Sequence, residues 1–260
     1  MEEIRKVFQV RFHWYLFTVA AGLIVLVGAI ELLVYSGNLR ARHRAEALLR
    51  TVRVWHLNET TLSETEPVRS AYSATRAQGG LVTGADPEQT FAISVGSDFL
   101  KAERLEHPGL WSLGFRPSNV AVVMRYRNEK LVYLSYSLMS PVRGTDGAIT
   151  ELVAEARVHQ DATPEPPRDY TVGYYLHPTP ILPDAQEIDL VGAITPRAGN
   201  EEHMAIFDFD LSCMSSFVGC TSACQIMPSA WREAHRQLAD REISAHYSYI
   251  TGETACRHTR

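Results

Sequence analysis

The longest apolar run in the chain is residues 14–35, in which Glu31 is the only charged side chain. As an α-helix it would extend about 33 Å, enough to cross the roughly 30 Å hydrocarbon core of a bilayer. Trp14, Tyr15 and Tyr35 lie at its ends, where aromatic side chains suit the two membrane interfaces. The run is longer than the roughly 7–15 apolar residues of a signal peptide. The pattern therefore predicts one transmembrane helix, with the lipid bilayer as its partner over residues 14–35.

Helical periodicity continues beyond this run and predicts a juxtamembrane helical segment over residues 36–80. The apolar positions that share one face are Ala41, Ala45, Leu48, Leu49, Val52 and Trp55. The Ser-Gly-Asn sequence at 36–38 is expected to end or kink the first helix. Thr65 and Pro67 predict the start of a second helix, which would stop at Gly79.

Residues 81–160 show strand-like alternation rich in β-branched and aromatic side chains. Asn128 and Glu129 predict a tight hairpin, and the Asp-Gly pair at 146–147 predicts another turn. We expect an antiparallel β-meander of at least three strands. The apolar face of its long strand would carry Val132, Leu134, Tyr136 and Leu138.

Two further units follow the meander. Residues 161–200 are rich in proline and are interpreted as a connection, with one short possible strand at 170–176. Residues 201–260 are expected to form a strand at 203–210, a cysteine cluster and a helix from about Pro228. With the flanking helices and the meander, the sequence predicts an α+β fold behind one N-terminal transmembrane helix.

Composition excludes some function classes. The 260 residues are 45% hydrophobic and 21% charged, as in globular domains, and the formal net charge is −5. No basic footprint suggests a nucleic-acid partner.

All four cysteines lie in the C-terminal part of the chain: Cys213, Cys220, Cys224 and Cys256. An even, clustered set suits disulfides in an oxidising compartment. If residues 220–224 are helical, Cys220 and Cys224 are too far apart to pair with each other. We therefore favour pairings that join Cys213 or Cys256 to one of these two.

The alternative use of the cysteines is a metal or thiol redox centre. A mixed set of Cys213, Cys220, Cys224, Cys256 and His235 is a weak metal candidate, with His246 and His258 also in reach. No C-x-x-C spacing is present, which argues against a thioredoxin-type centre or a zinc ribbon. We expect no bound cofactor.

The stretch from Met204 contains Asp208 and Asp210 in an Asp-x-Asp pattern after four apolar residues. This pattern resembles the first motif of haloacid-dehalogenase-type phosphatases, and the resemblance implies a nucleophilic Asp208 and an acid/base Asp210. The downstream Lys and acidic pair of that family are missing, because no Lys follows Lys130 and Asp240 is the only later Asp. We therefore interpret the two aspartates as structural, with a cation site as the alternative.

Basic residues flank the apolar run on both sides, so they do not decide its orientation. The cysteines favour a short cytoplasmic tail at 1–13 and an extracytoplasmic C-terminal domain. No complete catalytic motif is present. We expect a non-enzymatic, single-pass membrane protein that binds or scaffolds a protein partner, as an accessory subunit of a larger membrane complex. The alternative is a metal- or thiol-dependent redox enzyme that uses the C-terminal Cys and His residues.

Overall fold

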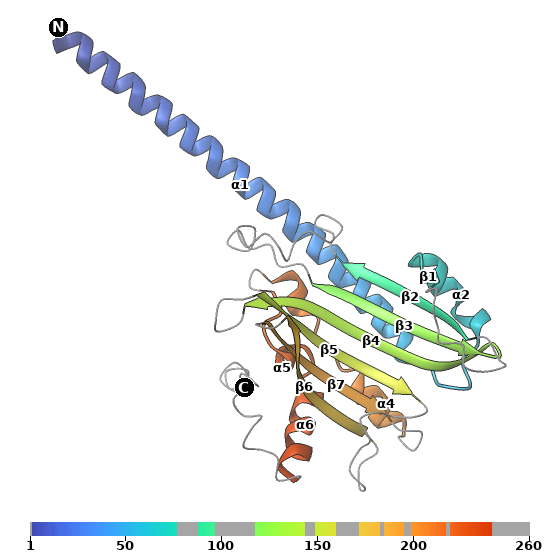
Figure 1. The fold of residues 1–260 in the computed structure, drawn as a ribbon. Coiled ribbons are helices and arrows are strands. Elements are labelled where there is room, and N and C mark those ends of the chain that lie inside the picture. Colours follow the sequence, from blue (N-terminus) through green and yellow to red (C-terminus); the bar gives the residue numbers. More distant parts are fainter. Residues whose placement is uncertain are drawn as a thin grey trace.

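The computed structural model describes residues 2–76, 88–96, 118–143, 149–159, 172–182, 185–194, 199–216 and 219–240 (Figure 1). Its helical elements are α1 (Glu2–Val52), α2 (Leu62–Ala71), α4 (Asn200–Ile206), the 3-10 helix η2 (Ser212–Ser215), α5 (Ala223–Ile226) and α6 (Pro228–Asp240). Its strands are β1 (Thr75–Arg76), β2 (Gln89–Gly96), β3 (Asn119–Arg127), β4 (Lys130–Arg143), β5 (Ile149–His159), β6 (Val172–Leu182) and β7 (Ala185–Ile194). The predicted α+β class is confirmed.

Helix α1 is one unbroken helix whose N-terminal part projects away from the domain (Figure 1). Among the described residues it is the one helix long and apolar enough to cross a membrane, and only 6% of its most apolar window is buried. The expected break at residues 36–38 is wrong. Ser36 donates its hydroxyl to the Leu33 carbonyl at 2.8 Å within the helix, and Asn38 is a buried position of the same helix. A single Gly costs a helix only about 1 kcal/mol.

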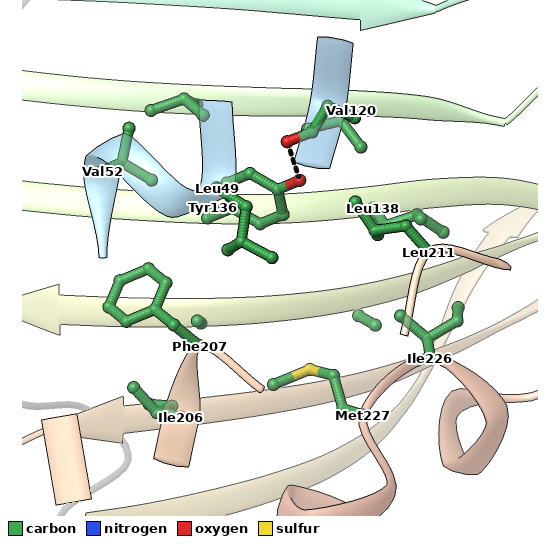
Figure 2. Packing of buried hydrophobic residues seen from close by; sticks show 14 of the residues in the cluster. Leu49, Val52, Val120, Tyr136, Leu138, Ile206, Phe207, Leu211, Ile226 and Met227 are labelled. Carbon is green, nitrogen blue, oxygen red and sulfur yellow. Dashed lines mark hydrogen bonds between the residues drawn. The ribbon is translucent and has the colours of Figure 1, made fainter. Parts of the chain in front are cut away.

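The C-terminal half of α1 forms the centre of the domain core. Its buried positions recur at helical spacing: Val34, Asn38, Ala41, Ala45, Leu48, Leu49 and Val52. This stripe faces the sheet, as Leu49 and Val52 show in Figure 2. Ala45, Leu48 and Val52 are completely buried. The predicted apolar face of the juxtamembrane segment is therefore a core face.

The seven strands form one sheet in the order β1-β2-β3-β4-β5-β7-β6. Strands β1 to β5 pair antiparallel with their neighbours, which confirms the predicted meander. Asn128 and Glu129 form the hairpin between β3 and β4 with φ values of 51° and 62°, as a two-residue type I′ turn requires. Helices α1, α4, α5 and α6 lie on the same face of the sheet, where they share one hydrophobic cluster with it.

A β-bulge corrects the predicted apolar face of β4. Arg125 is opposite Tyr133 and Tyr126 is opposite Leu131, so Val132 is the extra residue. Because a bulge shifts the alternation by one position, Leu131 is fully buried and Val132 is only partly buried. Leu134, Tyr136 and Leu138 face the core as predicted.

Residues 161–200 differ from the expected connection because they contain a strand pair. Strand β6 pairs antiparallel with β7, and β7 pairs parallel with β5. Pro178 and Pro180 fall on β6 at the edge of the sheet, where a missing backbone N–H is tolerated. A high proline content is therefore compatible with this outer strand.

The second helix begins earlier than predicted. Thr61 caps α2 by accepting the Glu64 N–H at 3.3 Å, and the Glu64 carboxylate accepts the Thr61 N–H at 2.7 Å. This capping box places Pro67 inside the helix. The helix ends at Ala71, near the left-handed Ser73 (φ 51°), whereas the predicted stop at Gly79 lies outside the described residues.

The predicted strand at 203–210 is wrong, because residues 200–206 form α4. The Glu202 carboxylate accepts the Gly199 N–H at 2.7 Å, and Glu201 lies in the same first turn. Acidic residues there interact favourably with the helix dipole. His203 and Ile206, one turn apart, are the buried positions. Helix α6 starts at Pro228 as predicted.

Candidate functional site

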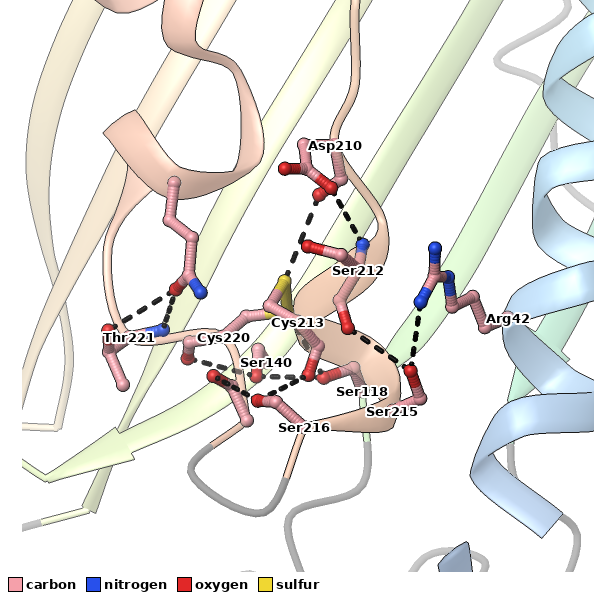
Figure 3. The surroundings of a disulfide bond; sticks show 12 residues. Arg42, Ser118, Ser140, Asp210, Ser212, Cys213, Ser215, Ser216, Cys220 and Thr221 are labelled. Atoms are coloured by element: carbon pink, nitrogen blue, oxygen red, sulfur yellow. Dashed lines mark hydrogen bonds between the residues drawn. A yellow bond between two sulfur atoms is a disulfide. The ribbon is translucent and has the colours of Figure 1, made fainter. Parts of the chain in front are cut away.

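The cysteine unit is tied together by a disulfide between Cys213 and Cys220, one of the pairings that the spacing favours (Figure 3). Both residues are buried, and Cys220 is connected to the sheet. Ser140 donates its hydroxyl to the Cys220 carbonyl at 3.3 Å, and the Ser140 and Ser118 hydroxyls are hydrogen-bonded at 2.9 Å. The disulfide therefore fixes the irregular segment around η2 to the ends of β3 and β4.

The same unit contacts α1 just beyond the apolar run. Arg42 donates to the Ser215 hydroxyl at 3.1 Å (Figure 3). It also donates to the Glu46 carboxylate at 2.6 Å. Arg42 thereby links α1 to η2. The Arg42 side chain lowers the pKa of Glu46 against the opposing effect of burial, so the carboxylate stays charged in this link.

The remaining cysteine and histidine candidates do not assemble into a described metal site. Cys224 is also disulfide-bonded, and Cys256, His246 and His258 lie outside the described residues. The backbone of His235 lies in α6, but its side chain is likewise outside the described part. Among the residues that the structure describes, no group of three His, Cys, Asp or Glu side chains is arranged to hold a metal ion.

Asp208 and Asp210 follow α4 in an irregular segment and have different partners. Asp208 accepts the Ser229 hydroxyl at 2.7 Å, next to the start of α6. Asp210 accepts the Ser212 N–H at 2.8 Å, at the start of η2. Asp210 therefore stabilises the start of η2 through a backbone N–H, as Asp commonly does, whereas Asp208 holds the Ser229 side chain in the first turn of α6.

A solvent-open pocket of about 440 Å³ lies where α1 ends and α4 and α6 meet. Its lining is Leu49, Arg53, Glu201, Met204, Ala205, Phe207, Asp208, Phe209 and Ser229. Sequence reasoning missed this pocket, because its residues come from three segments separated by up to 180 positions. Sequence analysis names Leu49 as a position of an apolar helix face and Asp208 in the Asp-x-Asp pattern, but neither as part of a pocket.

Two histidines pack beside this pocket. The His56 and His203 rings lie 4.8 Å apart, and His203 Nε2 lies 2.9 Å from the Arg53 carbonyl oxygen. Burial lowers the pKa of His203, and the neighbouring His56 lowers it further. His203 is therefore a neutral side chain near pH 7 that holds the backbone of Arg53 in place.

A charged cluster lies on the opposite face of the sheet, which sequence analysis also missed. Arg157 donates to both oxygens of Glu155, at 3.1 and 2.7 Å. Arg125 stacks over the Tyr133 ring at 4.3 Å. Burial raises the pKa of Tyr133, and the nearby Glu155 carboxylate adds to the effect. This cluster joins three neighbouring strands across one face.

Comparison with protein-family models, with curated proteins and with solved structures finds no match for this chain. The fold and the contacts described above define an α+β domain mounted on a long N-terminal helix. Its function is therefore inferred from its own residues.

Proposed function

We propose that this chain is a single-pass membrane protein whose non-enzymatic extracytoplasmic domain binds a protein partner, as an accessory subunit of a larger membrane complex. The observation that carries the proposal is the continuity of α1. The helix passes without a break from exposed apolar residues into the centre of the domain core.

This continuity supports a scaffold role because it leaves no flexible linker between anchor and domain. Val34 is already buried, although Tyr35, which follows it, belongs to the apolar run and is exposed. Arg42 then binds η2 within two turns. A domain held in this way keeps a fixed height and orientation relative to the bilayer, which suits a subunit that positions a partner.

The disulfides support an extracytoplasmic domain. Cys213, Cys220 and Cys224 are all paired, and such bonds persist in oxidising compartments. Paired sulfurs neither ligate a metal nor act as nucleophiles until they are reduced. This supports a structural use of the cysteines over the redox or metal-dependent alternative.

The exposed face of α1 supports lateral association with another membrane helix. A Cβ added at Gly22 or Gly28 would meet nothing within 4 Å. Ala29, seven residues after Gly22, is exposed on the same side of the helix, so these two small residues leave room for the close backbone approach that stabilises helix pairs in membranes.

The proposal is tested by native electrophoresis of gently solubilised membranes, followed by mass spectrometry of the band. We expect the 29.1 kDa chain in a larger species that contains a second protein. A Gly22→Leu/Ala29→Leu variant should release it, whereas the control Ile24→Leu, at an exposed position on the other side of the same helix, should not. Migration of the wild type as a free monomer would contradict the proposal.

A further inference from the structure

We propose that the pocket between α1, α4 and α6 binds a small zwitterion with an apolar side chain, the chemistry of an apolar α-amino acid. This inference does not depend on the proposed scaffold role, and only its argument for a water-soluble ligand rests on the proposed membrane span. It rests on three properties of the pocket lining: an apolar floor, an arginine with no ion-pair partner among the described residues, and two carboxylates that lie beyond salt-bridge distance of that arginine.

The floor of the pocket is apolar. Leu49 and Phe207 are buried beneath it, Phe209 is partly buried, and Met204 is 39% exposed at its edge. A cavity of about 440 Å³ falls in the usual range for small-molecule sites, which are mostly apolar with a few polar groups. The floor therefore suits an aliphatic or aromatic side chain.

Arg53 supplies the positive charge. Its Nε atom is buried and has no hydrogen-bond partner, and the side chain forms no salt bridge with any described residue. A buried guanidinium N–H without an acceptor is costly, and a carboxylate is the acceptor that an arginine fork fits best. His203 fixes the Arg53 carbonyl, so the base of the side chain is positioned before a ligand arrives.

Glu201 and Asp208 supply negative charge at the same pocket, and both are exposed. Neither lies within salt-bridge distance of Arg53, since no such pair exists among the described residues. Ser229 donates to one Asp208 oxygen at 2.7 Å and leaves the other able to accept a ligand ammonium. Opposite charges held apart in one pocket are complementary to a molecule that carries both.

The position of the pocket indicates that its ligand comes from water. Arg53 follows Tyr35 by 18 residues along a continuous helix, so it lies about 27 Å beyond the apolar run. A lipid headgroup at the membrane surface does not reach that far. The ligand is therefore a soluble molecule.

The test is titration calorimetry of the full-length protein in detergent, with leucine as the probe. Leucinamide lacks the carboxylate and N-acetylleucine lacks the ammonium, and each should bind at least about tenfold more weakly than leucine. This comparison uses the wild-type protein alone. Equal binding of the three compounds, or no binding of leucine, phenylalanine or methionine, would overturn the proposal.

Two variants test which side chain binds each charged group of the ligand. Arg53→Gln should weaken leucine binding about tenfold or more and abolish the preference for leucine over leucinamide. Asp208→Asn should abolish the preference over N-acetylleucine. Arg50→Gln is the matched control, because Arg50 is an exposed arginine of α1 that does not line the pocket. An Arg50→Gln effect as large as that of Arg53→Gln would also overturn the assignment.

Discussion

The Tyr136 hydroxyl donates a hydrogen bond of 3.2 Å to the Ala45 carbonyl oxygen, joining a central strand of the sheet to the backbone of α1 (Figure 2). Both residues have no exposed surface. Burial raises the pKa of Tyr136 well above its ordinary value, and Tyr72 and Glu46 add to the effect, so the hydroxyl remains a donor. The small Ala45 side chain allows the close approach on which this contact depends.

Tyr136→Phe should lower the free energy of unfolding by about 1 kcal/mol, because it removes this buried hydrogen bond and keeps the ring. Chemical denaturation of the full chain measures it. Tyr72→Phe is the control, since the Tyr72 hydroxyl bonds the Arg44 carbonyl in an exposed setting. If Tyr72→Phe proved the more damaging of the two, Tyr136 would not join helix and sheet as described.

Leu48→Ala should destabilise the domain by about 2–5 kcal/mol, because it opens a cavity where α1 packs against the sheet. Val54→Ala removes an apolar side chain that is 56% exposed just beyond α1 and should change stability little. Equal effects in thermal or chemical denaturation would mean that α1 is not part of the core.

Removal of the disulfide with Cys213→Ala/Cys220→Ala should destabilise the domain by about 2–3 kcal/mol in the chain-entropy model, because the bond closes a short loop with a sequence separation of 7. Denaturation under non-reducing conditions measures this loss. Ser216→Ala, within the same loop, removes the one hydroxyl proton that lies between the Cys213 and Gly219 carbonyl oxygens and serves as a smaller perturbation. An unchanged midpoint in the double variant would contradict a structural role for the bond.

Stability should fall as the pH is lowered from about 7.5 to 5.5. The pKa of His203 is lowered in the folded protein, so below its ordinary value of about 6.5 the unfolded chain takes up a proton that the folded one does not. The free energy of unfolding therefore decreases as the pH falls through this range. Burial and the adjacent His56 make protonation of His203 less favourable, and the hydrogen bond to the Arg53 carbonyl oxygen opposes them only in part.

Urea denaturation at several pH values checks this dependence. His203→Gln should flatten the fall in stability between pH 7.5 and 5.5, whereas His43→Gln, at an exposed position of α1, should leave it in place. A wild-type profile that is flat over this range would show that His203 is not a buried neutral histidine.

Much of the fold could be predicted from the sequence where periodicity was strong. The apolar run, the core face from Ala41 to Val52, the Asn128-Glu129 turn and the start of α6 all depend on local patterns. The strand prediction for residues 203–210 was wrong because the local sequence pattern is compatible with both a helix and a strand. The apolar residues before Asp208 predicted a strand, although Glu201 and Glu202 favour the start of a helix.

The candidate site was harder to predict than the fold. Cysteine spacing pointed to the pairing of Cys213 with Cys220, because it depends on nearby positions. The Arg53 pocket depends on tertiary packing of distant segments, and nothing in the local sequence marks Arg53 as different from Arg50. The Val132 bulge was missed for a similar reason, since it shows only when two strands are paired.

The most direct test of the account is the topology of α1. A membrane-impermeant maleimide is applied to intact cells that express full-length Gln9→Cys or Ser70→Cys, with the wild type, whose described cysteines are all paired, as the blank. Ser70 is exposed on α2, beyond the apolar run. The account predicts labelling of Ser70→Cys in intact cells and of Gln9→Cys only after permeabilisation. Labelling of both in intact cells, or the reverse pattern, would contradict a single span with the domain outside.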